Sequence, residues 1–107
     1  MAGDPAHRVV LCTCPDEEVA RQIATTLVEE DLAACVNVLP GVQSIYRWKG
    51  GVEHDAETLL IIKTTAQRYP ALEKRVQALH PYELPEIIAV PIAAGLQGYL
   101  DWLERPE

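Results

Sequence analysis

The sequence predicts an α+β domain on the ferredoxin-like βαββαβ plan, with a long hairpin between the second and third strands and an additional C-terminal helix. Three observations lead to this prediction. Segments rich in β-branched and apolar residues alternate with two stretches of helical periodicity. A Gly-Gly pair divides the longest β-rich stretch, as expected at a hairpin turn. The length of 107 residues suits one domain, so we treat 1–107 as a single unit.

The first strand is predicted at 8–14. The first helix is predicted to begin at Asp16 and to end near Asp31. Asp16 is a suitable N-cap, and the acidic residues after it favour the positive end of the helix dipole. This position explains the acidic group better than a metal site does. Apolar residues then recur at helical spacing and predict a helix that covers one face of a sheet: Val19, Ile23 and Leu27 on one row and Ala20, Ala24 and Val28 beside it.

The stretch 33–65 is predicted to form one hairpin that turns at 49–51. An arm of about fourteen residues reaches roughly 45 Å, whereas a helix of that length spans ~21 Å, so the hairpin must extend past any helix packed on it. Tyr46 and Trp48 make this overhang partly apolar, and we expect it to contact a neighbouring subunit. Pro40-Gly41 predicts a sheet edge or a bulge in the first arm.

The remaining elements are a helix, a strand and a short helix. Tyr69-Pro70 opens the second helix, and Pro81 ends it by disfavouring helical conformation at His80. A stiff connector leads to the last strand at 86–93. An amphipathic helix is expected at 95–105, with four side chains facing inward: Leu96, Tyr99, Leu100 and Leu103.

The central strands predict self-association. The runs VVLC, LLII and IIAV are apolar at every position, instead of alternating as in a sheet with one face in water. Two helices suffice for one face only. The second face is therefore expected to meet the same face of another copy.

Composition excludes several classes of protein. A hydrophobic content of 49% excludes a disordered chain, and the apolar runs are too short to cross a bilayer. A net charge of -7 disfavours binding to nucleic acid or anionic membranes. Residues 1–7 show no basic region followed by an apolar stretch, so we expect a flexible segment and a cytoplasmic protein. The odd number of cysteines, three, predicts reduced thiols. No phosphate loop, hydrolase elbow or zinc-finger spacing is present, and we expect no enzyme.

The predicted topology gathers chemically active side chains at one rim of the sheet. The end of the first strand, the hairpin tip, the end of the second helix and the start of the last strand meet there. They bring together Cys12, Cys14, Trp48, His80 and Tyr82. Lys63 and Cys35 fall at the opposite rim, and Cys35 is assigned to the core.

Two interpretations of these side chains stay open. Cys12 and Cys14 point to the same face of a strand, and the pair can chelate a metal only if the strand ends or bends at Thr13. Alternatively, Cys12 is a buried structural residue, as free cysteines often are. Four residues could furnish a cleft between subunits, with simple sheet-edge packing as the other interpretation: Trp48, Lys63, Tyr82 and Glu86.

The chain resembles the CutA, or divalent-cation-tolerance, family over almost its whole length. The blocks VVLCTCPDEEVARQIATTLVEEDLAACVNVLPGVQSIYRWKG, ETLLIIKTT, HPYELPEIIAVPI and YLDWL carry the resemblance. It implies a homotrimer whose hairpins join the subunits and a role in tolerance of divalent cations, copper above all. The copper ligands of the family correspond to Cys12 and His80. A further family histidine would precede His80, where this chain has Leu79.

The resulting hypothesis is a non-enzymatic, cytoplasmic homotrimer that weakly binds copper or another divalent cation. Thiolate and imidazole are both good copper ligands. The alternative is a trimeric signalling or scaffold module that senses a small ligand at clefts between subunits. Metal binding should depend on Cys12 and His80, whereas a small-molecule sensor should depend on cleft residues such as Trp48 and Lys63.

Overall fold

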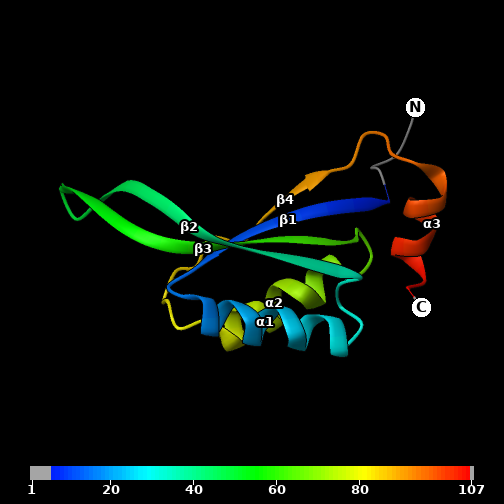
Figure 1. The fold of residues 1–107 in the computed structure, drawn as a ribbon, viewed down its shortest axis with the longest axis horizontal. Helices are drawn as coiled ribbons and strands as arrows, with labels where there is room; N and C mark the ends of the chain where they lie inside the picture. Colours follow the sequence, from blue (N-terminus) through cyan, green and yellow to red (C-terminus); the bar gives the residue numbers. More distant parts are fainter. Residues whose placement is uncertain (1–5, 107) are drawn as a thin grey trace.

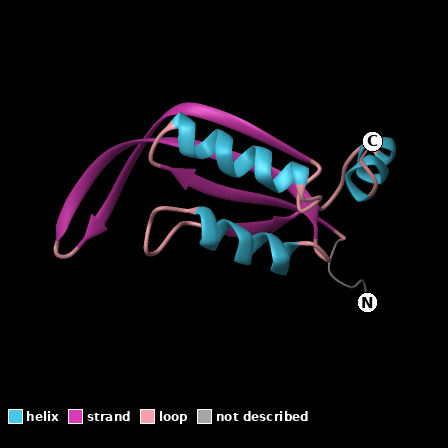
Figure 2. Cartoon of the chain, turned by 90° about the horizontal axis from the view of Figure 1, so that it is seen from below, coloured by secondary structure: helices cyan, strands magenta, loops and turns pink. Residues whose placement is uncertain are grey.

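A computed structural model describes residues 6–106 and contains the predicted order of elements. Four strands and three helices follow one another as β1 (His7–Cys14), α1 (Glu17–Glu29), β2 (Cys35–Trp48), β3 (Gly51–Thr65), α2 (Tyr69–Leu79), β4 (Ile88–Pro91) and α3 (Gln97–Glu104). The strands form one antiparallel sheet in the order β2-β3-β1-β4. Helices α1 and α2 lie side by side on one face of this sheet (Figures 1 and 2). The predicted βαββαβ plan with an added helix is confirmed.

The flexibility expected for residues 1–7 stays a prediction, and the structure describes the last two of these residues. His7 is the first residue of β1, and the backbone N–H of Ala66 donates to the carbonyl of Ala6 at 2.8 Å. Residues 1–5 lie outside the described residues. No helix in the part that is described is long and apolar enough to cross a membrane.

The β2–β3 hairpin extends well beyond both helices, as predicted (Figure 1). Its turn consists of Lys49 and Gly50, with φ angles of 48° and 81°, between the paired residues Trp48 and Gly51. Positive φ at both central residues gives the tight turn that matches the twist of the strands. A β-bulge interrupts the pairing at Pro40-Gly41, and β2 is also the edge strand. Both options predicted for this dipeptide therefore hold.

The core fills the space between the helices and the sheet. Asp16 caps α1 by accepting a 2.8 Å hydrogen bond from the N–H of Val19. The apolar row of α1 then packs on the inward side chains of β1 and β3, together with residues from α2. The fully buried core includes Val10, Cys12, Ile23, Leu27, Leu60, Ile62, Leu72 and Val76.

The opposite side of the sheet, here called the outer face, is not covered by α1 or α2 (Figure 1). Strand register places Val9 beside Val90, Leu11 between Ile61 and Ile88, and Leu39 beside Leu59 on this face. Three of these side chains are about half exposed: Leu39 (49%), Ile88 (51%) and Val90 (49%). The two-sided apolar character read from the sequence is thus present in the fold.

The C-terminal elements differ from expectation. Strand β4 is shorter than the predicted 86–93, and α3 begins at Gln97. Leu96 is 80% exposed and Tyr99 is 42% exposed, so the prediction that both face inward was wrong. Leu96 precedes the first turn of α3, and the helix lies at the end of the sheet instead of over a face (Figure 1). Only Leu103 is fully buried.

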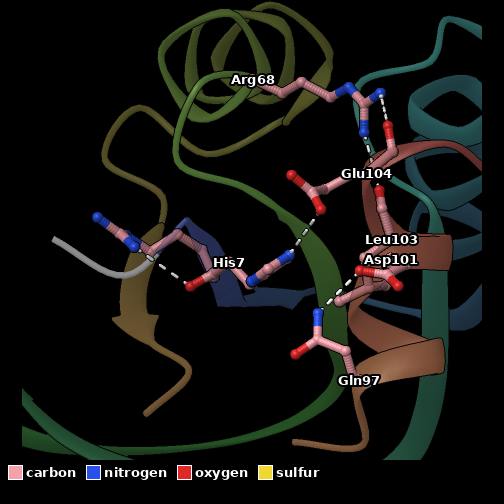
Figure 3. A network of polar contacts seen from close by, with 7 residues as sticks. His7, Arg68, Gln97, Asp101, Leu103 and Glu104 are labelled. Carbon is pink, nitrogen blue, oxygen red and sulfur yellow. Dashed lines mark hydrogen bonds and ion pairs between the residues drawn. The ribbon is translucent and has the colours of Figure 1, made fainter. Parts of the chain in front are cut away.

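Arg68 attaches α3 to the rest of the fold. Its guanidinium donates to the carbonyl oxygens of Leu103 at 3.0 Å and Glu104 at 2.7 Å, two acceptors that the helix end leaves without partners (Figure 3). His7 Nε2 lies 3.6 Å from the Glu104 carboxylate. Both contacts are at the rim opposite the hairpin tip.

Candidate metal site and rim cavity

Cys12, Cys14 and His80 form the one group among residues 6–106 with the composition and spacing of a metal site. Their ligand atoms all lie within 4.8 Å of one another. Both cysteines belong to β1 and point toward the helices, because residues two apart share a face of a strand. His80 is the C-cap residue of α2 and meets them at the end of that helix. The structure therefore brings together three of the five residues placed at this rim by sequence.

His80 is buried, although it lies at the end of a helix. It is 7% exposed, and its ring contributes to two hydrogen bonds. Nε2 lies 2.7 Å from the carbonyl oxygen of Thr13, and Nδ1 lies 3.1 Å from the backbone N–H of Tyr82. Since a carbonyl accepts and an N–H donates, these partners select the neutral ring with its proton on Nε2. His80 therefore links β1 to the connector after α2.

The two thiols are fully buried and interact with each other. The hydrogen bond with Cys14 and burial raise the pKa of Cys12, so this thiol holds its proton at neutral pH. The same hydrogen bond lowers the pKa of Cys14, against the opposing effect of burial. This arrangement makes Cys14 the more readily ionised member of the pair.

The donor set fits a soft or borderline metal ion. Two thiolates on one such ion, each at ~2.3 Å, have sulfurs roughly 3.8 Å apart, and the ligand atoms here lie within 4.8 Å of one another. A chelating pair was expected to require that the strand end or bend at Thr13. The strand continues instead, and Cys14 still pairs with Thr58. Nε2 can become a ligand only after it gives up its proton and its bond to Thr13.

A cavity of about 530 Å³ lies beside this cluster and extends toward the hairpin tip. We call it the rim cavity. Its chemically distinctive lining residues are Tyr46, Trp48, Glu57, Tyr82, Glu83 and Glu86. Tyr82 stands between the two sites, because its ring centroid is 4.7 Å from that of His80 and its hydroxyl donates to Glu57 at 2.7 Å.

Three of the four predicted cleft residues, Trp48, Tyr82 and Glu86, line this one cavity, and Lys63 does not. Lys63 pairs with Cys35 and Val9 nearer the other end of the sheet, as the topology predicted. Cys35 is half-buried and not part of the core to which it was assigned. It lies on the outer side of β2, since the neighbouring Val36 packs against the core.

Sequence reasoning did not single out Glu57, and it weighed Cys14 only as the partner of Cys12 in a possible chelating pair. Glu57 has a usable signal, because alternation places it on the same side of β3 as Leu59 and Ile61. An acidic residue in phase with apolar neighbours is unusual. The partner that buries it, Tyr82, comes from a connector whose path no local pattern predicts.

Comparison with known proteins agrees with the resemblance seen in the sequence. The family model described as CutA1 divalent ion tolerance protein matches residues 8–106. The divalent-cation tolerance protein CutA of Thermus thermophilus is 63% identical over 99 residues, which cover 92% of this chain and 96% of the relative. Mouse protein CutA is 50% identical over 93 residues, and the match spans only 52% of that longer protein.

Solved structures show the same fold. The Thermus thermophilus protein superposes with a TM-score of 0.90 at 61% identity, covering 92% of this chain and 95% of that one. A CutA from Archaeoglobus fulgidus, described as periplasmic, gives a TM-score of 0.88 at 39% identity and covers 91% and 94% of the two chains. From the family match and these relatives, the chain belongs to the CutA1 divalent ion tolerance family.

Proposed function

We propose that this protein acts in divalent-cation tolerance by binding copper or another divalent metal ion through Cys12, Cys14 and His80. The observation that carries the proposal is the convergence of these three ligand atoms within 4.8 Å. Thiolate and imidazole suit copper, and thiolates favour its cuprous state. A bound ion would be sequestered by these side chains and would supply no reaction.

The chemistry of the free site bears on affinity. Binding would release protons from the thiols and from Nε2 of His80, so affinity should rise with pH. It would also cost the hydrogen bond to Thr13, which accounts for the weak binding we expect. We propose a non-enzymatic role, in which His80 serves as a structural link and a metal ligand.

We further propose a cytoplasmic homotrimer. The three cysteines are free thiols, as a reducing compartment favours. The half-exposed apolar side chains of the outer face and the overhanging hairpin give each subunit surface that another copy can cover. The periplasmic description belongs to the Archaeoglobus protein.

Calorimetric titration with copper under reducing conditions tests the metal site. The variants Cys12→Ser, Cys14→Ser and His80→Ala should each weaken binding at least about tenfold, the effect of losing roughly 1.4 kcal/mol of interaction. The control Cys35→Ser makes the same replacement of sulfur by oxygen outside the cluster. It should bind copper as tightly as the wild type does. Equal affinity in all four variants would exclude this site.

A second candidate function is sensing of a small molecule by a signalling or scaffold trimer. The rim cavity favours it, because a volume of about 530 Å³ and a lining of aromatic and polar side chains suit a small ligand. Substitution of Trp48 separates the two candidates. Trp48→Ala should abolish ligand binding in the cavity and leave the copper titration unchanged.

A further inference from the structure

Both ring nitrogens of His80 already hold backbone groups of other segments. Nε2 donates to the carbonyl oxygen of Thr13 at 2.7 Å, and Nδ1 accepts from the backbone N–H of Tyr82 at 3.1 Å. Each nitrogen of an imidazole has a single in-plane position, which serves for a proton, a hydrogen bond or a metal ion. A metal ion at His80 therefore competes directly with these hydrogen bonds.

The choice of nitrogen makes no difference to Tyr82. If Nε2 ligates the ion, the one proton of the neutral ring must lie on Nδ1, and Nδ1 then faces the N–H of Tyr82 as a second donor. If Nδ1 ligates the ion, the position that accepted this N–H is taken. In both cases the N–H of Tyr82 loses its acceptor. Coordination by His80 is thus incompatible with the present position of Tyr82.

Tyr82 is the partner that can move. The backbone of His80 is held by α2, because its N–H donates to the carbonyl of Val76 at 2.8 Å. Tyr82 is 36% exposed, so its N–H can find water as a new partner and avoid the cost of a buried, unbonded donor. Its ring packs on that of His80 with centroids 4.7 Å apart, and its hydroxyl donates to Glu57 at 2.7 Å. Movement of the backbone toward water draws this hydroxyl away from Glu57.

These contacts lie in the wall of the rim cavity. Thr13, Glu57 and Tyr82 all line it. The carbonyl that Nε2 releases and the side chain that Nδ1 releases therefore belong to the same cavity, which lies between the metal cluster and the hairpin. A change at His80 reaches the cavity without passing through the hydrophobic core.

We propose that metal binding at Cys12, Cys14 and His80 displaces Tyr82 and thereby reshapes the rim cavity. The ring of His80 is the two-state element, since it bonds either to Thr13 and Tyr82 or to the ion. This inference rests on the metal binding of the proposed function and adds a conformational response to it. The fold would then report whether the metal site is loaded at the base of the overhanging hairpin.

Amide hydrogen exchange of the whole chain with and without zinc tests the release of Tyr82. Zinc suits two thiolates and an imidazole, and it is diamagnetic, so NMR spectra can follow each amide. A ligand of the folded state slows the exchange of amides that open by global unfolding, as those in the centre of β1 and β3 should. The amide of Tyr82 should respond in the opposite direction and exchange at least about tenfold faster with zinc, because its acceptor is lost.

Removal of the Tyr82 hydroxyl tests the link to Glu57. If coordination must break this hydrogen bond, Tyr82→Phe has already lost it and should bind zinc at least about fivefold more tightly than the wild type in calorimetry, the low end of typical coupling between sites. Tyr69→Phe is the matched control, since it removes a hydroxyl that donates to Glu73 at 2.6 Å within α2. It should leave the zinc affinity unchanged.

Two results would each overturn the coupling: exchange of the Tyr82 amide that zinc slows or leaves unchanged, or zinc binding by Tyr82→Phe that is no tighter than that of the wild type. The variant Cys14→Ser separates this failure from failure of the metal site. If zinc binding depends on Cys14 but Tyr82 does not respond, the coupling alone is rejected. If Cys14→Ser binds zinc as tightly as the wild type, the metal site and the coupling are rejected together.

Discussion

Replacement of His80 by alanine separates the structural role of this residue from its role as a metal ligand. In the metal-free protein the ring joins the carbonyl of Thr13 to the N–H of Tyr82, by contacts of 2.7 and 3.1 Å. Both hydrogen bonds lie in a buried region, since His80 is 7% exposed, so water does not readily take the place of the ring. The His80→Ala variant should therefore lose stability before any metal is added.

The expected loss follows from these contacts. Each hydrogen bond contributes about 1 kcal/mol net, and a buried partner left without a bond costs about 1–3 kcal/mol more. Because the carbonyl and the N–H can relax toward solvent at this rim, we expect a total of about 2–4 kcal/mol. His80→Gln can retain a donor near Nε2 and should recover about 1 kcal/mol.

The assay is urea unfolding at fixed protein concentration, without and then with copper. His54→Ala, at an exposed position of the hairpin, is the control and should stay within about 0.5 kcal/mol of the wild type. Copper should stabilise His80→Ala by about 1.4 kcal/mol less than it stabilises the wild type and His54→Ala, because a tenfold weaker folded site gains less from the same metal concentration. A His80→Ala protein as stable as the wild type without metal would refute the structural role, and one stabilised by copper as much as the wild type would refute the ligand role.

Three further predictions concern the turn, the pH dependence and the outer face. Gly50→Ala should lower the unfolding free energy by about 1 kcal/mol, because φ is positive at this turn residue. Gly98→Ala in α3 should raise it by about 0.5–1 kcal/mol. If Gly50→Ala melted at a higher temperature than Gly98→Ala, the turn geometry would be contradicted. Burial and a hydrogen bond to Glu73 raise the pKa of Tyr69 from 10.0 to about 12. As the pH rises, the unfolded state therefore loses this proton before the folded state does. The unfolding free energy should fall between about pH 10 and pH 12. Tyr69→Phe should make that fall shallower, and an unchanged slope in pH-dependent denaturation would argue against it. Ile88→Lys on the outer face should reduce the mass measured by sedimentation. The control Val28→Lys on α1, where the side chain is 42% exposed, should leave that mass unchanged. If Ile88→Lys did not affect the assembly, the outer face would be excluded as an interface.

Local patterns in the sequence sufficed for the order and type of the elements. Asp16 caps α1 and Pro40-Gly41 marks the bulge, as predicted. The hairpin turns within the predicted 49–51, at Lys49-Gly50, and Gly51 already belongs to β3. These features depend on backbone conformations and hydrogen bonds within a few residues. The family resemblance likewise follows from the sequence, since it spans nearly all the chain.

The tertiary structure decided which side chains are buried and which meet. Cys14 joins Cys12 and His80 because the end of α2 packs on β1, and Glu57 is buried because the connector brings Tyr82 over it. The prediction of an inward face for α3 holds at Leu103 and was wrong at Leu96 and Tyr99, because that helix lies at the end of the sheet. Amphipathic spacing predicts which residues share one face of a helix or strand. Whether that face is buried depends on the distant segment that covers it. The sequence by itself therefore determined the fold and the family, and only the packing of remote segments determined the metal cluster, the buried carboxylate and the cavity between them.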